Sequence, residues 1–130
     1  MDLITVAREA GLEFKVKVRG HEFSSDMSVS DGGRDAAPAP AELVGGALGA
    51  CIAMMVQAYC DTCGYTDGEV GVSLAVELGD NPKRVAGFVI DLELPADVPE
   101  EKHDVIMRVA EKCSIHETLA NPPRVDIDIT

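Results

Sequence analysis

The sequence predicts an α+β domain with the element order βββ-α-ββ-α-β, in which antiparallel sheets pack around a buried central helix. Three observations favour this fold. A run of apolar residues without charge extends from Leu43 to Val56, alternating apolar and polar residues flank it on both sides, and an apolar stripe at helical spacing follows near the C-terminus. The chain of 130 residues is long enough for one hydrophobic core, so we expect a single domain over residues 1–130.

Three strands are expected before the helix. Residues 3–8 form a short β-like run, and residues 12–19 alternate strictly between apolar and charged side chains, which is typical of a half-buried strand. Gly20 ends this strand, and residues 23–29 predict a weaker third one. Residues 30–37 have the composition of a loop.

The central helix is expected to begin at Pro38 or Pro40, because proline suits the first turn of a helix, and to end at Gly64. The apolar run is too short to cross a bilayer and is apolar on every face. One sheet cannot cover every face of a helix. A second copy of the chain is therefore the natural cover, which predicts a homodimer.

The C-terminal half predicts a hairpin, a helix and a closing strand. Residues 70–78 and 86–94 alternate strictly and are joined by a turn at 79–82. A helix begins at Pro99, and its apolar stripe ends at Cys113, which should face inward. Residues 117–123 read as a loop, and residues 125–129 as the closing strand.

Composition excludes some classes of partner. The net charge of −12 argues against nucleic acid and anionic membranes, which need basic patches. The N-terminal residues show no pattern of a signal peptide, so we expect a cytoplasmic protein whose four cysteines are reduced thiols.

Cys51 lies in the middle of the apolar helix, and with Cys113 it is the first candidate for chemistry. A buried cysteine usually serves as a small hydrophobic residue. A thiol in apolar surroundings is inert unless a nearby cation offsets the burial. Arg19 and Arg34 are the candidate cations, although each is more often a solvated surface charge.

A metal site is the second candidate, because Cys60, Cys63, Cys113 and His116 together have the spacing of a Cys₃His zinc site. Cys60 and Cys63 close a helix, whereas structural zinc sites usually take cysteines from tight turns. A helix C-terminus also disfavours a thiolate, which weakens a redox role for this pair. Packing or partial exposure is the favoured interpretation of Cys60 and Cys63.

Two stretches carry a family resemblance. The segments GGRDAAPAPAELVGGALGACIAMMVQAY and AEKCSIHETLANPPRVDIDI resemble the signatures of the OsmC/Ohr family of osmotically inducible and organic hydroperoxide resistance proteins. The resemblance covers nearly the whole chain. It implies an intertwined homodimer and a thiol-dependent peroxidase that reduces organic hydroperoxides at the subunit interface, with no cofactor or metal and with an external dithiol as reductant.

The resemblance also implies roles for single residues. Cys51 matches the peroxidatic cysteine and Cys113 the resolving one, while Arg19 matches the arginine that activates the thiolate, with Arg34 as a rival. Ala41 stands where the best-known branch has a glutamate, and Glu42 matches a glutamate common in the more divergent branch. Substrate would meet an apolar wall of Leu43, Leu48, Ile52, Met54 and Met55, in which Leu48, Ile52 and Met55 are the expected binding residues. Two alternatives remain open: a non-catalytic dimer that binds an apolar small molecule, and a zinc-stabilised domain.

Overall fold

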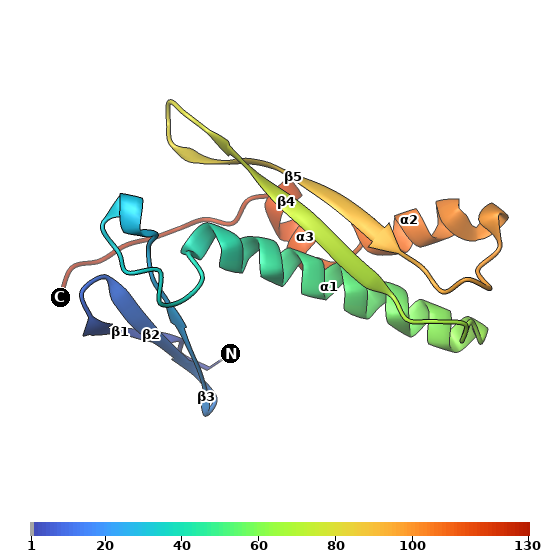
Figure 1. Cartoon of the computed structure of the whole chain (residues 1–130), viewed down its shortest axis with the longest axis horizontal. Helices are drawn as coiled ribbons and strands as arrows, with labels where there is room; N and C mark the ends of the chain where they lie inside the picture. Colours follow the sequence, from blue (N-terminus) through green and yellow to red (C-terminus); the bar gives the residue numbers. More distant parts are fainter. Residues whose placement is uncertain (1) are drawn as a thin grey trace. The chain divides into compact units, whose positions relative to one another are not determined.

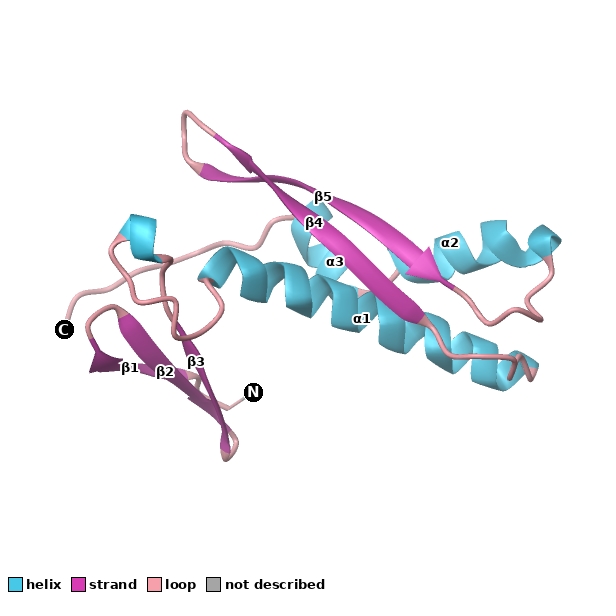
Figure 2. Cartoon of the chain, viewed as in Figure 1, coloured by secondary structure: helices cyan, strands magenta, loops and turns pink. Residues whose placement is uncertain are grey.

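The computed structural model describes residues 2–130 and divides the chain into two compact units, Met1–Val44 and Gly45–Thr130. Both strands and helices are present, and every described strand pair is antiparallel, so the α+β fold is confirmed (Figures 1 and 2). Whether the chain is a single domain stays a prediction.

The first unit contains a sheet of three described strands, β1 (Thr5–Ala10), β2 (Glu13–Val18) and β3 (His21–Ser25), in the order β1-β2-β3. Val6, Val16 and Phe23 stand opposite one another across it and form an apolar row. On the alternate register Lys15 lies 3.7 Å from Glu9 and 3.8 Å from Glu22. The alternation predicted from the sequence is therefore correct for β2.

The third strand ends earlier than expected, because the side chain of Asp26 accepts hydrogen bonds from the backbone of the segment that follows it. Its carboxylate accepts hydrogen bonds from the backbone N–H groups of Met27 at 2.8 Å, Arg34 at 3.1 Å and Ala36 at 3.1 Å. These bonds, that of Ala36 foremost, outweigh the opposing effect of burial and lower the pKa of Asp26. The chain turns through a short 3₁₀ helix, η1 (Val29–Asp31), so the prediction of a strand over residues 23–29 is wrong beyond Ser25.

Helix α1 (Pro40–Cys63) has 24 residues, and its first five belong to the first unit. In the second unit, α1 lies along a hairpin of β4 (Gly71–Gly79) and β5 (Arg84–Glu93) (Figure 1). Leu74, Val76 and Phe88 of the hairpin face the helix at Gly45, whereas Leu78 and Val89 are exposed. A Cβ atom on Gly45 or Gly49 would come within 3.0 Å or 3.1 Å of Leu74. Glycine at these positions therefore allows the helix to approach the hairpin closely.

Two further helices, α2 (His103–Glu111) and α3 (Ser114–Ala120), follow the 3₁₀ turn η2 (Glu100–Lys102). α2 was expected. α3 corrects the expectation of a loop from residue 117, and it forms because Cys113 caps it: the Cys113 sulfur accepts a hydrogen bond from the His116 backbone N–H at 3.2 Å. The core of the unit joins α1 to these helices and consists of Leu48, Ile52, Val56, Cys60, Val98, Ile106, Ala110 and Cys113.

The expected closing strand is not present in the described chain. Residues 122–130 are drawn as loop in Figure 2, and Val125, Ile127 and Ile129 are 76%, 84% and 98% exposed. A strand needs a second strand to accept and donate its ladder hydrogen bonds. Alternation in the sequence was therefore not sufficient to predict one here.

One face of α1 is buried and another is exposed. Leu48, Ile52 and Val56 are at most 4% exposed, whereas Met54 is 70% and Met55 41% exposed. A single chain therefore leaves one face of α1 uncovered, and its expected cover by a second copy of the chain stays a prediction. At 24 residues, α1 is also long and apolar enough to span a membrane, which corrects the expectation that the apolar segment is too short. Core helices of soluble proteins can have the same length and composition.

Candidate active site

The structure brings Cys51 and Cys113 together in the second unit. Cys51 lies in the middle of α1 and is half-buried, while Cys113 lies directly before α3 and is fully buried. The two thiol side chains form a hydrogen bond, and neither cysteine is in a disulfide. Residue Ser114, which begins α3, places its hydroxyl oxygen 3.8 Å from the Cys51 sulfur.

The start of α3 changes the acidity of Cys51. Burial alone would raise the pKa of Cys51, but the Ile115 backbone N–H, the Cys113 thiol and the hydroxyl and N–H of Ser114 all donate toward its sulfur. The net result is a pKa below the ordinary value for cysteine. Hydrogen-bond donors therefore favour a thiolate at this position.

Cys113 is shifted in the opposite direction. Burial raises its pKa, and the neighbouring Cys51 raises it further, against the effect of the bond from the His116 N–H. Cys113 therefore keeps its proton while Cys51 is the more acidic thiol. Cys51 is thus the more exposed and the more acidic of the two thiols, which are the properties that favour nucleophilic attack. The catalytic roles of Cys51 and Cys113 stay predictions.

The residues of the predicted apolar wall lie in different surroundings. Leu48 and Ile52 belong to the core and are 3% and 4% exposed, whereas Met55 is 41% exposed. A substrate could meet Met55 without any rearrangement of the core. A role of these three residues in substrate binding stays a prediction.

The predicted cation and acid belong to the first unit. Arg19 is exposed in the turn between β2 and β3, where its φ of 49° and the 84° of Gly20 are the left-handed backbone that tight hairpin turns use. Arg34 donates to Glu13 at 2.8 Å. Glu42 accepts a hydrogen bond from the Ala39 N–H at 2.9 Å and so caps α1. The activating roles of Arg19 and Glu42 stay predictions.

The zinc interpretation is not supported. Within the part of the chain that the structure describes, no three His, Cys, Asp or Glu side chains are grouped so that they could hold a metal ion. Cys60 is buried in the core and Cys63 is exposed, as expected for a pair with packing or partial exposure.

Residues 32–128, which include both thiols and α3, match the family described as OsmC-like protein. The chain belongs to this family. No curated protein sequence matches the OsmC-like chain.

Solved structures share the fold of the OsmC-like chain. A Psychrobacter arcticus protein described as an osmotic stress induced and detoxification response protein is 15% identical over 91% of this chain and 88% of its own, with a TM-score of 0.82. An OsmC-like protein from Mycoplasma pneumoniae is 14% identical over 92% and 86%, with a TM-score of 0.76. The organic hydroperoxide resistance protein OsmC of Legionella pneumophila is 15% identical over 92% and 90%, with a TM-score of 0.66.

Sequence reasoning missed two contributors to this OsmC-like site, Ser114 and Ile115, and considered His116 only as a zinc ligand. It searched for a cation to activate Cys51, whereas in the second unit the donors come from the start of α3. A signal was present in the sequence. Ser114 followed three residues later by Glu117 is the S-x-x-E pattern of a helix start, and it would have predicted a helix that begins within one residue of the observed N-cap, Cys113.

Proposed function

We propose that this OsmC-like protein is a thiol-dependent peroxidase that reduces organic hydroperoxides. The observation that carries the proposal is the contact between Cys51 and Cys113, with the pKa of Cys51 lowered and that of Cys113 raised. A reactive peroxidatic cysteine must ionise readily, and its resolving partner must lie within reach. The family membership supports the same function.

The chemistry would proceed in three steps. The Cys51 thiolate attacks the distal oxygen of the hydroperoxide, the O–O bond breaks, and the alkoxide leaves with a proton as the alcohol, while Cys51 becomes a sulfenic acid. Cys113 then attacks this sulfur and displaces water, which forms the disulfide. An external dithiol returns both cysteines to thiols and is itself oxidised to a disulfide.

Stoichiometric oxidation tests the proposal. An equimolar amount of an alkyl hydroperoxide is expected to give one disulfide, mapped by mass spectrometry to Cys51 and Cys113. Cys51→Ser should consume no peroxide. Cys113→Ser should keep the sulfenic acid on Cys51 after one equivalent of hydroperoxide and form the sulfinic acid when a second equivalent is added. Cys63→Ser is the matched control, because Cys63 is exposed at the end of α1, and it should behave as wild type. Turnover that survives in Cys51→Ser would contradict the proposal.

A homodimer and a cytoplasmic location belong to the proposal as well. The exposed methionines of α1 support the dimer, because a helix face of this kind is usually covered by a second surface. The mechanism requires reduced thiols at Cys51 and Cys113, and reduced thiols fit the cytoplasm. Arg19 remains the proposed activating cation, and Arg19→Ala should slow peroxide reduction more than Arg34→Ala.

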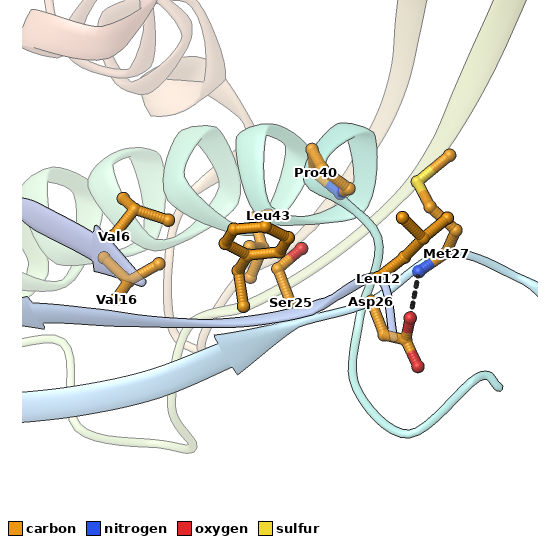
Figure 3. A pocket seen from close by; sticks show the side chains of 9 residues that line it. Val6, Leu12, Val16, Ser25, Asp26, Met27, Pro40 and Leu43 are labelled. Atoms are coloured by element: carbon orange, nitrogen blue, oxygen red, sulfur yellow. Dashed lines mark hydrogen bonds between the residues drawn. The ribbon is translucent and has the colours of Figure 1, made fainter. Parts of the chain in front are cut away.

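A non-catalytic binding protein is the second candidate, and one cavity favours it. The first unit contains a cavity of ≈ 330 Å³ between the sheet and the first turn of α1 (Figure 3). Its lining is mainly apolar and consists of Val6, Leu12, Phe14, Val16, Ser25, Asp26, Met27, Pro40 and Leu43. Two results together would favour this candidate. The protein would show no peroxidase activity, and an apolar fluorescent probe would bind the wild type and Cys51→Ser with the same affinity.

A further inference from the structure

Helix α3 has few contacts of its own with the rest of the second unit. It has seven residues, and none of residues 114–120 is buried. Ile115 and His116 are half-buried, with Ile115 packed against the core, and the other five residues are exposed. A free helix of this length is unstable in water. The contacts that hold α3 in place are therefore concentrated in its first turn.

Two sulfur atoms accept hydrogen bonds from this first turn. The Cys113 sulfur is the N-cap of α3 and accepts from the His116 N–H at 3.2 Å. The Cys51 sulfur lies 3.8 Å from the Ser114 hydroxyl oxygen and accepts from the backbone N–H groups of Ser114 and Ile115. When Cys51 is a thiolate, these bonds are charge-assisted and roughly twice as strong as neutral ones. α3 is thus most stable while both cysteines are reduced.

Oxidation of the two cysteines to a disulfide weakens these hydrogen bonds. It removes the negative charge from Cys51, and it draws the two sulfurs together and away from the donors that now point at them. An uncharged sulfur is only a weak acceptor. The first N–H groups of a helix have no partner inside the helix, so those of α3 then gain more from water than from the sulfurs.

We propose that the Cys51–Cys113 disulfide releases the first turn of α3 and so opens the pair to the external dithiol. The disulfide itself is part of the proposed function, on which this step rests. In the reduced chain Cys113 is fully buried, and Ser114 and Ile115 contact the Cys51 sulfur, so α3 in its place restricts access to the pair.

Reduction follows once the first turn is open. One thiol of the dithiol attacks the Cys51 sulfur, the disulfide bond breaks, and Cys113 leaves as a thiolate that takes up a proton. The second thiol then attacks the sulfur that the dithiol has bound to Cys51. Cys51 is released as a thiol, and the dithiol becomes a disulfide. With both sulfurs reduced, α3 closes again.

Hydrogen–deuterium exchange of the full chain tests this role of α3. The chain carries Cys63→Ser, which removes the exposed thiol, and its reduced form is compared with the form obtained after treatment with diamide. Diamide takes the two hydrogens of two thiols and leaves a disulfide, so no peroxide turnover is needed. In peptides from residues 114–120 the oxidised form should exchange roughly tenfold faster or more, as expected for the loss of a hydrogen bond to a charged group. The β4–β5 hairpin is the internal control and should exchange equally in both forms.

Ser114→Pro separates the stability of α3 from the state of the sulfurs. Ser114 is the first residue of α3, where proline is favoured, and Cys113 before it already has the extended backbone (φ −62°, ψ 143°) that suits the residue preceding a proline. Proline removes both donors of Ser114 and fixes the first turn. The difference in exchange between the two forms should therefore shrink, and dithiothreitol should reduce the disulfide more slowly. Ser114→Ala is the matched control, because it removes the hydroxyl without fixing the backbone, and it should keep the difference in exchange and the rate of reduction.

Three results would overturn the proposal: equal exchange of residues 114–120 in the two forms, the absence of a Cys51–Cys113 disulfide after diamide, and equally fast reduction of Ser114→Pro and Ser114→Ala. The first two do not depend on whether Ser114→Pro folds. Peroxide turnover is a separate result. Faster exchange of oxidised α3 in a chain that consumes no hydroperoxide would support the role of α3 and contradict the peroxidase function. Turnover with α3 equally protected in both forms would do the reverse.

Discussion

The hydroxyl oxygen of Ser114 lies 3.8 Å from the sulfur of Cys51, although the two residues are 63 positions apart in the sequence. The contact joins the middle of α1 to the start of α3. Because Ser114 also directs its backbone N–H toward the same sulfur, this one residue contributes two of the interactions that lower the pKa of Cys51. The acidity of Cys51 therefore depends on where α3 begins.

Replacement of Ser114 by alanine should raise the pKa of Cys51, because it removes the hydroxyl donor and leaves the effect of burial. Alkylation of Cys51 at neutral pH should slow by roughly two- to tenfold, since one pKa unit changes the thiolate fraction about tenfold. The rate of iodoacetamide alkylation as a function of pH measures this shift. Ser73→Ala, an exposed serine on β4, is the matched control, and an equal profile for both variants would contradict the role of Ser114.

Asp26 should make the stability of the protein depend on acid. Its pKa is lower in the folded chain than in the unfolded one, so its contribution is complete above the unfolded pKa and disappears as the pH falls through the folded pKa. Asp26→Asn should lower stability at neutral pH and flatten this dependence. Urea unfolding at neutral and acidic pH provides the measurement.

The matched control for Asp26 is Asp35→Asn. Asp35 is exposed, and its side chain accepts no hydrogen bond from the described residues. It also has a φ of 54°, which asparagine tolerates. If Asp26→Asn and Asp35→Asn unfold with the same pH dependence, the hydrogen bonds that the Asp26 carboxylate accepts from residues 27–36 do not stabilise the fold.

The glycines of α1 should respond differently to alanine. Gly46 meets nothing within 4 Å among the described residues, so Gly46→Ala should stabilise the helix by about 0.5–1 kcal/mol. In Gly45→Ala the new Cβ would lie 3.0 Å from Leu74 and 3.2 Å from Val76, which offsets or reverses that gain. Thermal unfolding compares the two, and equal stabilisation would mean that the helix and the hairpin are not in close contact.

The proposed homodimer should bury more than roughly 2,000 Å² in total, as expected of a permanent interface. Light scattering at micromolar concentration should give twice the mass of the 13.8 kDa chain. Met54→Lys should weaken the assembly, because Met54 is 70% exposed on α1, whereas Ala120→Lys on α3 should not. A stable monomer of the unsubstituted chain would remove the dimer from the proposal.

Local periodicity predicted much of the fold. The β4–β5 hairpin and α1 were expected within a few residues of their observed bounds, because alternation and the apolar run are both local signals. The end of β3 was not, since it depends on the hydrogen bonds of Asp26 to residues up to ten positions away. Such tertiary contacts leave no periodic pattern.

The site was predictable in its residue types more than in its geometry. Cys51 and Cys113 stood out together as thiols expected to be buried, but their peroxidatic and resolving roles came from the family resemblance. The sequence also suggested a charged activator. The structure places backbone N–H groups at the Cys51 sulfur. Nearly every residue type carries such a group, so the residue types alone do not identify these donors.

The C-terminal residues have a consequence for solubility. Val125, Ile127 and Ile129 form a row of exposed apolar side chains on backbone without strand partners, which is the kind of segment that nucleates aggregation. Asp126 and Asp128 interrupt this row with charge and act as gatekeepers against stacking of one chain on another. Neutralising both aspartates should therefore make the protein precipitate, and removing the tail should have the opposite effect.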